Sequence, residues 1–245
     1  VAELWSELQN SSFEPREFEV SFGAPDALDA IAIPNSQMDA ILRGFVDRVD
    51  CWKQHGNDYY RVVDYKTGKK DFDYCDVFNG VGLQMLLYLF TLTQNGQAAF
   101  GETTPAGVLY LLSDPPPSTD EKKSAFSVDG LVLDDDRVLI GMDADGEGHW
   151  LPTGLKIKDG RPAGDKLVSL AMLGRIAAQL EKLLLQMADG LYDGDIAARP
   201  LQHGGILRCN SCDYRPVCRH RDGENETEVP KGIWKRVLLA SDNEE

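Results

Sequence analysis

The amino-acid sequence predicts a mixed α/β fold, and three observations support this class. Segments with the composition of β-strands come first, an apolar segment of helical length follows, and a short buried strand and a long amphipathic helix come later. The chain has 245 residues, of which 42% are hydrophobic and 27% are charged. These values are typical of a globular protein of one domain or two small ones, large enough to bury a core.

The first predicted elements are strands at residues 17–23, 41–52 and 59–68, which are rich in β-branched and aromatic residues. The polar turn KQHGND separates the last two, so we expect them to form an antiparallel hairpin. Residues 81–94, VGLQMLLYLFTLTQ, have the length of a helix and end beside Gly96, a plausible helix stop. Residues 106–113, AGVLYLLS, form a continuous apolar run that predicts a buried strand flanked by helices.

A long amphipathic helix is predicted after Asp165, which would cap its N-terminus, and is expected to stop at Gly190. Its apolar face would consist of Leu170, Leu173, Ile176, Leu180, Leu184 and Met187. Three segments rich in proline or glycine are predicted to be loops, namely SDPPPSTDEKK, DADGEGHW and KDGRPAGDK.

The charge of the chain is strongly negative, with 40 acidic residues against 25 Lys and Arg and a net charge of −15. Taken alone, this charge argues against a general nucleic-acid binder. Its distribution is uneven, because residues 199–221 carry five arginines against one aspartate, whereas residues 114–147 carry ten acids against three bases. The arginine-rich segment could therefore still attract phosphate.

The sequence begins at Val1, without an initiator methionine and without the basic and apolar pattern of a signal peptide, so we expect a fragment of a longer protein. It has no apolar run long enough for a membrane span. Three of its five cysteines lie in CNSCDYRPVC, a spacing that indicates a metal or cluster site rather than a disulfide framework. These features together favour a cytoplasmic location.

The predicted hairpin brings acidic residues together. If its turn centres between residues 55 and 56, opposed residues have numbers that sum to 111, which pairs Asp47 with Asp64. Opposed Cβ atoms lie about 4.5–5.5 Å apart, so the two carboxylates repel unless a cation lies between them. Lys66 shares the face of Asp64, because side chains alternate along a strand. A divalent cation would relieve the repulsion; the alternative is a solvated surface cluster in which Arg48 and Lys66 pair with the acids.

Gln84 and Tyr88 are the polar residues of the apolar segment GLQMLLYLF. Their i, i+4 spacing places them on one face of the predicted helix. Either residue alone would suit a helix edge that meets solvent. The pair therefore indicates a functional site only in combination with the acidic residues of the hairpin.

Three segments, GFVDRVD, VVDYKTG and LQMLLYL, resemble in this order the motifs of RecB-like PD-(D/E)xK nucleases. In that family a glycine-led strand supplies one acid, a D-x-K strand supplies the second acid and the lysine, and a Q-x-x-x-Y helix follows. Nearly the whole chain is similar to the C-terminal nuclease domains of the AddB type. The resemblance implies a restriction-endonuclease-like mixed sheet flanked by helices, with a nuclease core at residues 1–200, an inserted segment at about 114–166 and a cysteine-containing tail at 201–245.

The resemblance also implies roles for single residues. Asp47 and Asp64 would bind Mg²⁺ or Mn²⁺, with the Tyr65 carbonyl as a third ligand, and Lys66 would position or polarise the attacking water. Gln84 and Tyr88 would orient the DNA strand or the lysine.

Three further positions match or depart from the family pattern. Glu19 occupies the place of the family's acid on the upstream strand. Phe45 departs from the pattern, because a basic residue is frequent there, and no histidine precedes Glu19 where the family commonly has a catalytic one.

By this resemblance the chain would be a Mg²⁺-dependent exonuclease domain that hydrolyses single-stranded DNA during double-strand-break processing and recombinational repair. Its partners would be an AddA-like helicase-nuclease subunit and the remainder of its own AddB-like chain. No association with a membrane is expected. Two alternatives stay open: a CRISPR-associated iron-sulfur exonuclease, and a catalytically inactive DNA-binding scaffold of a helicase complex.

The grouped cysteines Cys209, Cys212 and Cys218 have a C-x2-C-x5-C spacing, one thiolate short of a four-cysteine zinc or [4Fe-4S] site. His220 could complete a zinc site locally. The resemblance implies instead a [4Fe-4S] cluster whose fourth cysteine lies upstream, so that the cluster would be incomplete here, and unligated cysteines are a third possibility. The remaining two, at positions 51 and 75, are interpreted as isolated thiols.

Overall fold

The computed structural model describes residues 2–25, 27–34, 36–54, 56–68, 70–113, 126–229, 232 and 234. The chain forms two compact units. The first comprises residues 1–32, 41–72 and 84–177, and the second comprises residues 33–40, 73–83 and 178–245. The predicted division at residues 200 and 201 remains a prediction.

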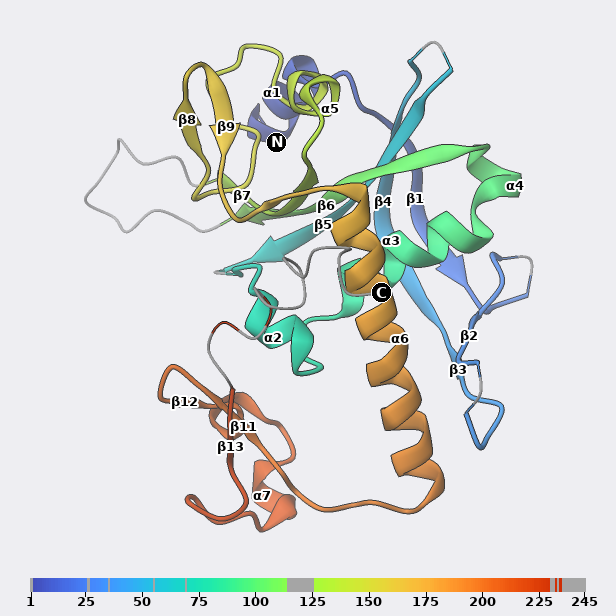
Figure 1. The fold of residues 1–245 in the computed structure, drawn as a ribbon, viewed down its shortest axis with the longest axis vertical. Coiled ribbons are helices and arrows are strands. Elements are labelled where there is room, and N and C mark those ends of the chain that lie inside the picture. The colour runs from blue at the N-terminus through green and yellow to red at the C-terminus, as the bar shows by residue number, and fades with distance from the viewer. Residues whose placement is uncertain are drawn as a thin grey trace, which may run out of the picture. The chain divides into compact units, whose positions relative to one another are not determined.

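The first unit is built on a six-stranded mixed sheet with the strand order β1-β4-β5-β6-β7-β10 (Figure 1). Neighbouring strands are antiparallel except for the pairs β5–β6 and β7–β10, which are parallel. This arrangement confirms the predicted mixed α/β class. The strands are β1 (Glu14–Phe22), β4 (Gly44–Trp52), β5 (Asp58–Thr67), β6 (Thr103–Ser113), β7 (Phe126–Leu133) and β10 (Leu167–Val168).

Two helices of the first unit cover opposite faces of the β4–β5 hairpin. Side chains alternate along a strand, so Tyr60 and Asp64 share one face and Arg61 lies on the other. On the first face, the Tyr60 hydroxyl donates to the Leu89 carbonyl of α3 (Gln84–Asn95) at 2.7 Å. On the second, Arg61 pairs with Glu7 of α1 (Ala2–Asn10). The sheet therefore offers two distinct environments, one under each helix.

The predicted helix at residues 81–94 corresponds to α3. It ends at Asn95, where Gly96 follows as predicted, and the amide of Gly96 donates to the Leu92 carbonyl at 2.9 Å. The buried strand predicted at 106–113 is confirmed as part of β6, which packs against α3.

Smaller elements of the first unit are α4 (Gln97–Phe100), α5 (Asp136–Met142), a β2–β3 hairpin (Ile31–Ala32 and Ile41–Leu42) and a β8–β9 hairpin (Lys156–Lys158 and Arg161–Ala163).

The β8–β9 hairpin corrects the predicted loop KDGRPAGDK. Asp159 and Gly160 at its tip have φ values of +51° and +79°, the left-handed pair that suits a tight two-residue hairpin turn. The composition that indicated a loop therefore reflects the turn, and the residues on either side of it pair as short strands.

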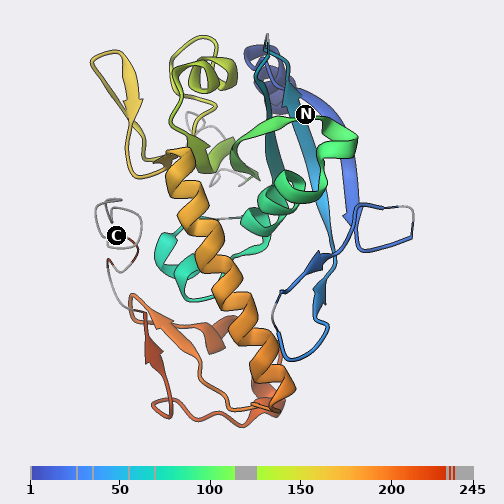
Figure 2. The ribbon, with the colours of Figure 1, turned by 45° about the vertical axis from the view of Figure 1, so that its right-hand side comes forward.

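The second unit contains α2 (Tyr74–Phe78), residues 178–192 of α6 (Leu170–Tyr192) and the C-terminal segment. Figure 2 shows the C-terminal segment in orange as a small sheet with short helical turns. Its strand order is β12-β11-β13, and its elements are β11 (Leu201–His203), β12 (Ile206–Leu207), the 3₁₀ turn η1 (Arg208–Ser211), α7 (Arg215–Cys218) and β13 (Thr227–Glu228).

The boundaries predicted for the long helix α6 are wrong at both ends. The helix begins at Leu170, and the hydroxyl of Ser169, rather than Asp165, accepts the amide of Met172 at 3.1 Å. Asp165 is separated from the helix because Leu167 and Val168 form the buried strand β10.

At its C-terminal end, α6 continues through Gly190 to Tyr192. The chain then turns at Gly194, whose φ of +71° suits a residue without a Cβ. Within the predicted apolar face, Leu173, Ile176, Leu180 and Leu184 are buried, whereas Leu170 and Met187 are exposed.

Part of the predicted inserted segment lies outside the described residues. This part is 114–125, which also contains most of the predicted loop SDPPPSTDEKK. Residues 126–133 of the same segment form β7, a strand of the main sheet. None of the helices in the described ranges is long and apolar enough to pass through a membrane.

Candidate active site

The β4–β5 hairpin has the predicted register. Arg48 pairs with Val63 and Asp50 pairs with Arg61, so the numbers of opposed residues sum to 111. Continued by one residue beyond the pair of Arg48 and Val63, the same register places Asp47 opposite Asp64. The Asp47 carboxylate also accepts the backbone amide of Tyr65 at 3.3 Å.

Asp64 lies at the centre of this group, with only 3% of its surface exposed. The ammonium of Lys66 lies 2.9 Å from its Oδ1 and 2.7 Å from its Oδ2. Burial raises the pKa of Asp64, Lys66 acts to lower it, and the neighbouring Asp47 carboxylate raises it again, so that the net pKa is raised. Two carboxylates therefore lie close together in a largely buried position beside Lys66.

This donor set fits a hard divalent cation. Two carboxylates converge at one end of the hairpin, and oxygen ligands are those that Mg²⁺ and Mn²⁺ prefer. A cation between Asp47 and Asp64 would supply further positive charge and leave Lys66 beside the bound ion. These three residues form the candidate active site.

A buried ion network lies on the opposite face of the same hairpin. Arg48 contacts Glu7 at 3.2 Å and Asp50 at 2.7 Å, and Arg61 pairs with the same two acids. All four side chains are at most 2% exposed. Burial alone would lower the pKa of Arg48, but Asp50 and Glu7 outweigh it and raise the pKa, so the guanidinium stays charged.

The network corrects the alternative in which Arg48 belongs to a solvated surface cluster. Its Nη1 also donates to the hydroxyl of Tyr65 at 2.6 Å, so the residue between Asp64 and Lys66 is anchored from the face opposite to theirs. The sequence contained a signal for this network, because the register sum of 111 pairs Asp50 with Arg61, and two opposite charges in cross-strand contact stabilise each other.

Gln84 and Tyr88 form a pair on α3, where the Gln84 amide donates to the Tyr88 hydroxyl at 2.6 Å. The Tyr88 ring packs edge-on against Phe22 with ring centroids 5.4 Å apart. A Cβ on Gly44 would lie 2.8 Å from the Phe22 ring and 3.1 Å from the Tyr88 ring. The glycine that leads β4 is therefore required for close packing beside Tyr88.

The contacts described for Gln84 and Tyr88 do not include the two aspartates or Lys66. Their predicted cooperation on a DNA strand stays a prediction.

Glu19 lies on β1 beside β4, and its side chain is exposed. The flanking residues Phe18 and Val20 pair with Arg48 and Val46, which brings the Glu19 backbone next to that of Asp47. Its φ of +51° is rare for a residue with a side chain and marks a local irregularity in the strand. The exposed Phe45 follows Gly44 at the start of β4.

A pocket of about 310 Å³ lies beside the candidate active site. Three consecutive residues of β5, Tyr65, Lys66 and Thr67, form one wall, and Leu4 of α1 and Phe126 of β7 lie on others. The lysine therefore borders both the carboxylate pair and an open cavity of the first unit.

The three grouped cysteines are in the second unit, with Cys209 half-buried and Cys212 and Cys218 exposed. Within the described part of the chain, no set of potential metal ligands in mutual reach includes any of the three. His220, predicted as a local fourth ligand, instead lies in reach of Asp222 and Glu226. The [4Fe-4S] assignment therefore remains a prediction.

Comparisons with known proteins agree with the motifs. The family model described as the PD-(D/E)XK nuclease superfamily matches residues 1–219. The chain is 32% identical over 259 residues to the B subunit of the ATP-dependent helicase/deoxyribonuclease of Clostridium novyi, with 97% of this chain and 23% of the relative covered. The protein of the same name from Symbiobacterium thermophilum is 34% identical, with 94% of this chain and 22% of the relative covered. That from Acetivibrio thermocellus is 31% identical, with coverage of 97% and 22%. The chain thus spans less than a quarter of the length of these relatives.

Proposed function

Because the chain belongs to the PD-(D/E)XK nuclease superfamily, we propose that it is the metal-dependent exonuclease domain of an AddAB-type helicase-nuclease. In this proposal it hydrolyses phosphodiester bonds of single-stranded DNA during double-strand-break processing and recombinational repair. The observation that carries the proposal is the convergence of Asp47, Asp64 and Lys66 at one end of the β4–β5 hairpin.

The proposed chemistry assigns each of these side chains a task. Asp47 and Asp64 hold Mg²⁺ or Mn²⁺, with the Tyr65 carbonyl as a third ligand. The bound ion, when present, polarises the phosphate and lowers the pKa of a water molecule. Lys66, whose ammonium already lies within 3 Å of Asp64, positions that water and offsets the negative charge that develops on the phosphate.

In this proposal the remaining predicted residues orient the substrate or the catalytic groups, or add charge at the edge of the site. Gln84 and Tyr88, fixed to each other by their hydrogen bond, orient the DNA strand or the lysine. Glu19, next to Asp47 through the β1–β4 pairing, contributes a further carboxylate at the edge of the site.

The proposed partners follow from the relatives, whose name describes one subunit of a helicase/deoxyribonuclease. We propose that the chain works with an AddA-like helicase-nuclease subunit and the rest of an AddB-like chain in the bacterial cytoplasm. In that longer protein, Cys209, Cys212 and Cys218 bind a [4Fe-4S] cluster together with a cysteine from outside this chain.

The test is cleavage of single-stranded DNA labelled at either end, with Mg²⁺ and with EDTA. Asp64→Asn keeps the size of the side chain but removes its charge, so cleavage is expected to fall by about 100-fold or more. Lys66→Met should produce a loss of the same order, and Asp58→Asn, at the start of the same strand, is the matched control.

The two labels also report the polarity of degradation. Cleavage by folded Asp64→Asn protein at the wild-type rate would overturn the assignment of the active site. DNA binding without metal-dependent cleavage by the wild-type chain would instead favour the inactive scaffold.

A further inference from the structure

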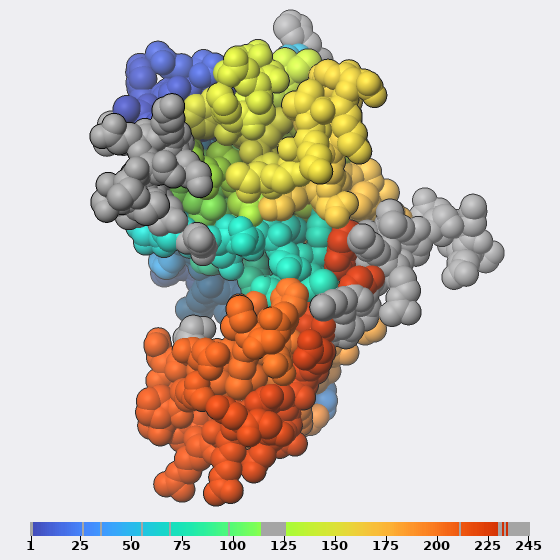
Figure 3. All heavy atoms as spheres, turned by 90° about the vertical axis from the view of Figure 1, so that its left-hand side faces the viewer, coloured from blue at the N-terminus to red at the C-terminus, as the bar shows by residue number. Residues whose placement is uncertain are grey.

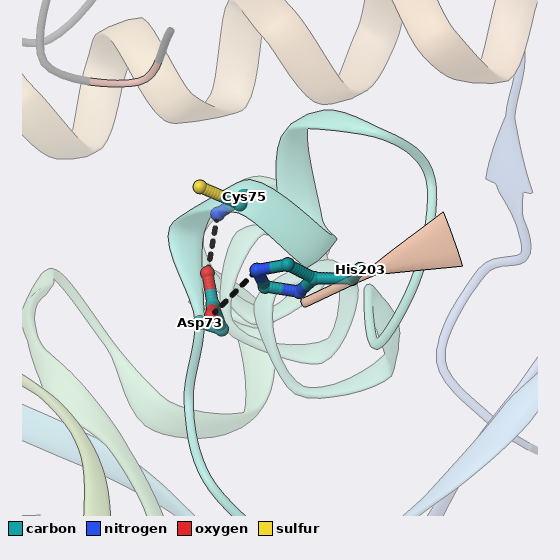
Figure 4. A group of neighbouring side chains, drawn as sticks. All are labelled: Asp73, Cys75 and His203. Atoms are coloured by element: carbon teal, nitrogen blue, oxygen red, sulfur yellow. Dashed lines mark hydrogen bonds and ion pairs between the residues drawn. The ribbon is translucent and has the colours of Figure 1, made fainter. Parts of the chain in front are cut away.

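The candidate active site belongs to the first unit, and the second unit contains another cluster of potential metal ligands (Figure 4). Asp73 and Cys75 lie at the start of α2, and His203 ends β11. One carboxylate oxygen, the cysteine sulfur and one ring nitrogen all lie within 4.8 Å of one another. The sequence alone indicated only an isolated thiol at position 75.

The separation of the ligand atoms suits a single small ion. Nε2 of His203 lies 3.8 Å from Oδ2 of Asp73, which is too long for a hydrogen bond. Two ligands at the usual Zn–N and Zn–O distances in a tetrahedral site lie about 3.3–3.5 Å apart. A contraction of this pair by about 0.3–0.5 Å would therefore give zinc its normal distances to both atoms. The Cys75 sulfur, which points away from the His203 ring in Figure 4, would reach the ion by a change of side-chain rotamer.

A neighbouring carboxylate orients the histidine in the way that metal ligation requires. Nδ1 of His203 lies 3.1 Å from Oδ1 of Asp76, and Arg208 pairs with the other oxygen of Asp76. If Nδ1 donates to Asp76, the lone pair of Nε2 points towards Asp73. Metal-bound histidines commonly have such a carboxylate on their second nitrogen.

Within the described part of the chain, one oxygen of the Asp73 carboxylate accepts no hydrogen bond. Its Oδ1 accepts the backbone amide of Cys75 at 2.6 Å, which caps α2, and Oδ2 is the atom that faces His203. Capping and metal binding therefore use different oxygens of the same side chain.

The ligand types indicate zinc rather than magnesium or calcium. A cysteine sulfur and an imidazole are ligands for zinc, whereas Mg²⁺ and Ca²⁺ prefer oxygen. Cys75 is buried, and Asp73 and His203 are half-buried. Two other groups of potential ligands in the described ranges lack a cysteine, namely Asp145 with Glu147 and His149, and His220 with Asp222 and Glu226.

We propose that Asp73, Cys75 and His203 form a zinc site, with water or another ligand in the fourth position. The cysteine loses its thiol proton when zinc binds, so that a thiolate enters the coordination sphere. The ion would join α2 to β11, two segments of the second unit that are far apart in the sequence. The site would therefore stabilise the second unit independently of the nuclease metal.

The test must first remove competing thiolates. A variant with Cys209→Ser, Cys212→Ser and Cys218→Ser is stripped with EDTA, dialysed and titrated with zinc against a chromophoric chelator. The expected result is one zinc per chain. With Co²⁺ in place of zinc, the same variant should show a thiolate-to-cobalt charge-transfer band.

Further substitutions in the triple-serine background locate the ion. Cys75→Ser and His203→Gln should each abolish stoichiometric zinc binding, whereas Cys51→Ser, on a thiol of the first unit, should not change it. Asp76→Asn leaves all three ligands in place and should weaken zinc binding by about 10–100-fold.

Circular dichroism establishes that each variant is folded. The proposal is overturned if the triple-serine variant takes up no zinc, or if Cys75→Ser binds it with unchanged affinity. If Cys75→Ser does not fold, the cobalt spectrum of the triple-serine variant decides, because absence of the charge-transfer band would equally overturn the proposal.

Discussion

At the scale of single residues, side chains alternate along β4 and β5, so adjacent charged residues lie on opposite faces of the sheet and have different partners. Asp47 and Asp64 lie on the face under α3, where Lys66 contacts Asp64, and they are the proposed ligands of a metal ion. Arg48 and Asp50 belong to the other face, where Glu7 and Arg61 complete a buried network. A charged residue in this hairpin is therefore understood only from its face and its partner.

Glu7 connects α1 to this network through both arginines, so Glu7→Gln should destabilise the first unit. The substitution removes one negative charge and leaves Arg48 and Arg61 buried with incomplete compensation. The expected loss is about 3 kcal/mol in the free energy of unfolding, measured by urea denaturation. Glu3→Gln, an exposed position on the same helix, is the control and should change stability by less than about 0.5 kcal/mol. Equal stability of the two variants would contradict a structural role for the network.

At the scale of elements, three of the helices begin with a capping side chain. Asp73 caps α2, Asp135 caps α5, and Ser169 caps α6. The Asp135 carboxylate accepts the amide of Arg137 at 2.8 Å. Burial alone would raise the pKa of Asp135, but the hydrogen bonds from Arg137 dominate and lower it.

Asp135→Ala should therefore destabilise α5 by about 1 kcal/mol at neutral pH. The lowered pKa means that the charged carboxylate favours the folded state. Its contribution is complete above the pKa of an unfolded aspartate and is lost as the pH falls through the lowered pKa of the folded state. The stability difference between the wild type and Asp135→Ala should shrink over that acidic range. Thermal unfolding at several pH values measures it, with the exposed Glu181→Ala as control; a difference that grows towards low pH would contradict the cap.

Comparison of the elements with their predictions indicates which structural features can be predicted from local sequence patterns. Local signals predicted the register of the β4–β5 hairpin and the end of α3, because turn position and helix stops depend on nearby residues. The cap of α6 is Ser169 and not the predicted Asp165, because Leu167 and Val168 pair with β7 in a long-range contact that local patterns do not reveal. The approach of His203 to Cys75 is also long-range, and no spacing rule in the sequence reports it.

At the scale of the whole molecule, the net charge of −15 opposes contact with DNA except where cations are supplied. A metal ion at Asp47 and Asp64 would reverse the local field at the candidate active site. The other positive region is the segment 199–221, part of the orange surface in Figure 3. Three of its five exposed arginines are already paired with acids: Arg199 with Asp195, Arg208 with Asp76 and Arg215 with Asp222.

We therefore expect the isolated chain to bind single-stranded DNA weakly and in a salt-dependent manner. Arg219 and Arg221, the other two arginines of the segment, should carry most of the phosphate contacts. Replacing either by Ala should reduce the slope of log affinity against log salt by about 0.7, the value for one phosphate contact on a single strand. Arg215→Ala should reduce it less, because Asp222 already neutralises that side chain.

Fluorescence anisotropy with a labelled oligonucleotide measures these slopes, and Asp64→Asn as the background prevents cleavage during the titration. Lys156→Ala, an exposed base of the first unit, is the control. Tight binding that is insensitive to salt, or slopes unchanged by both arginine substitutions, would show that this segment is not the DNA contact. The predicted pattern would mean that this acidic chain holds DNA only weakly by itself, which agrees with the proposed function, in which a longer chain and a second subunit contribute to binding.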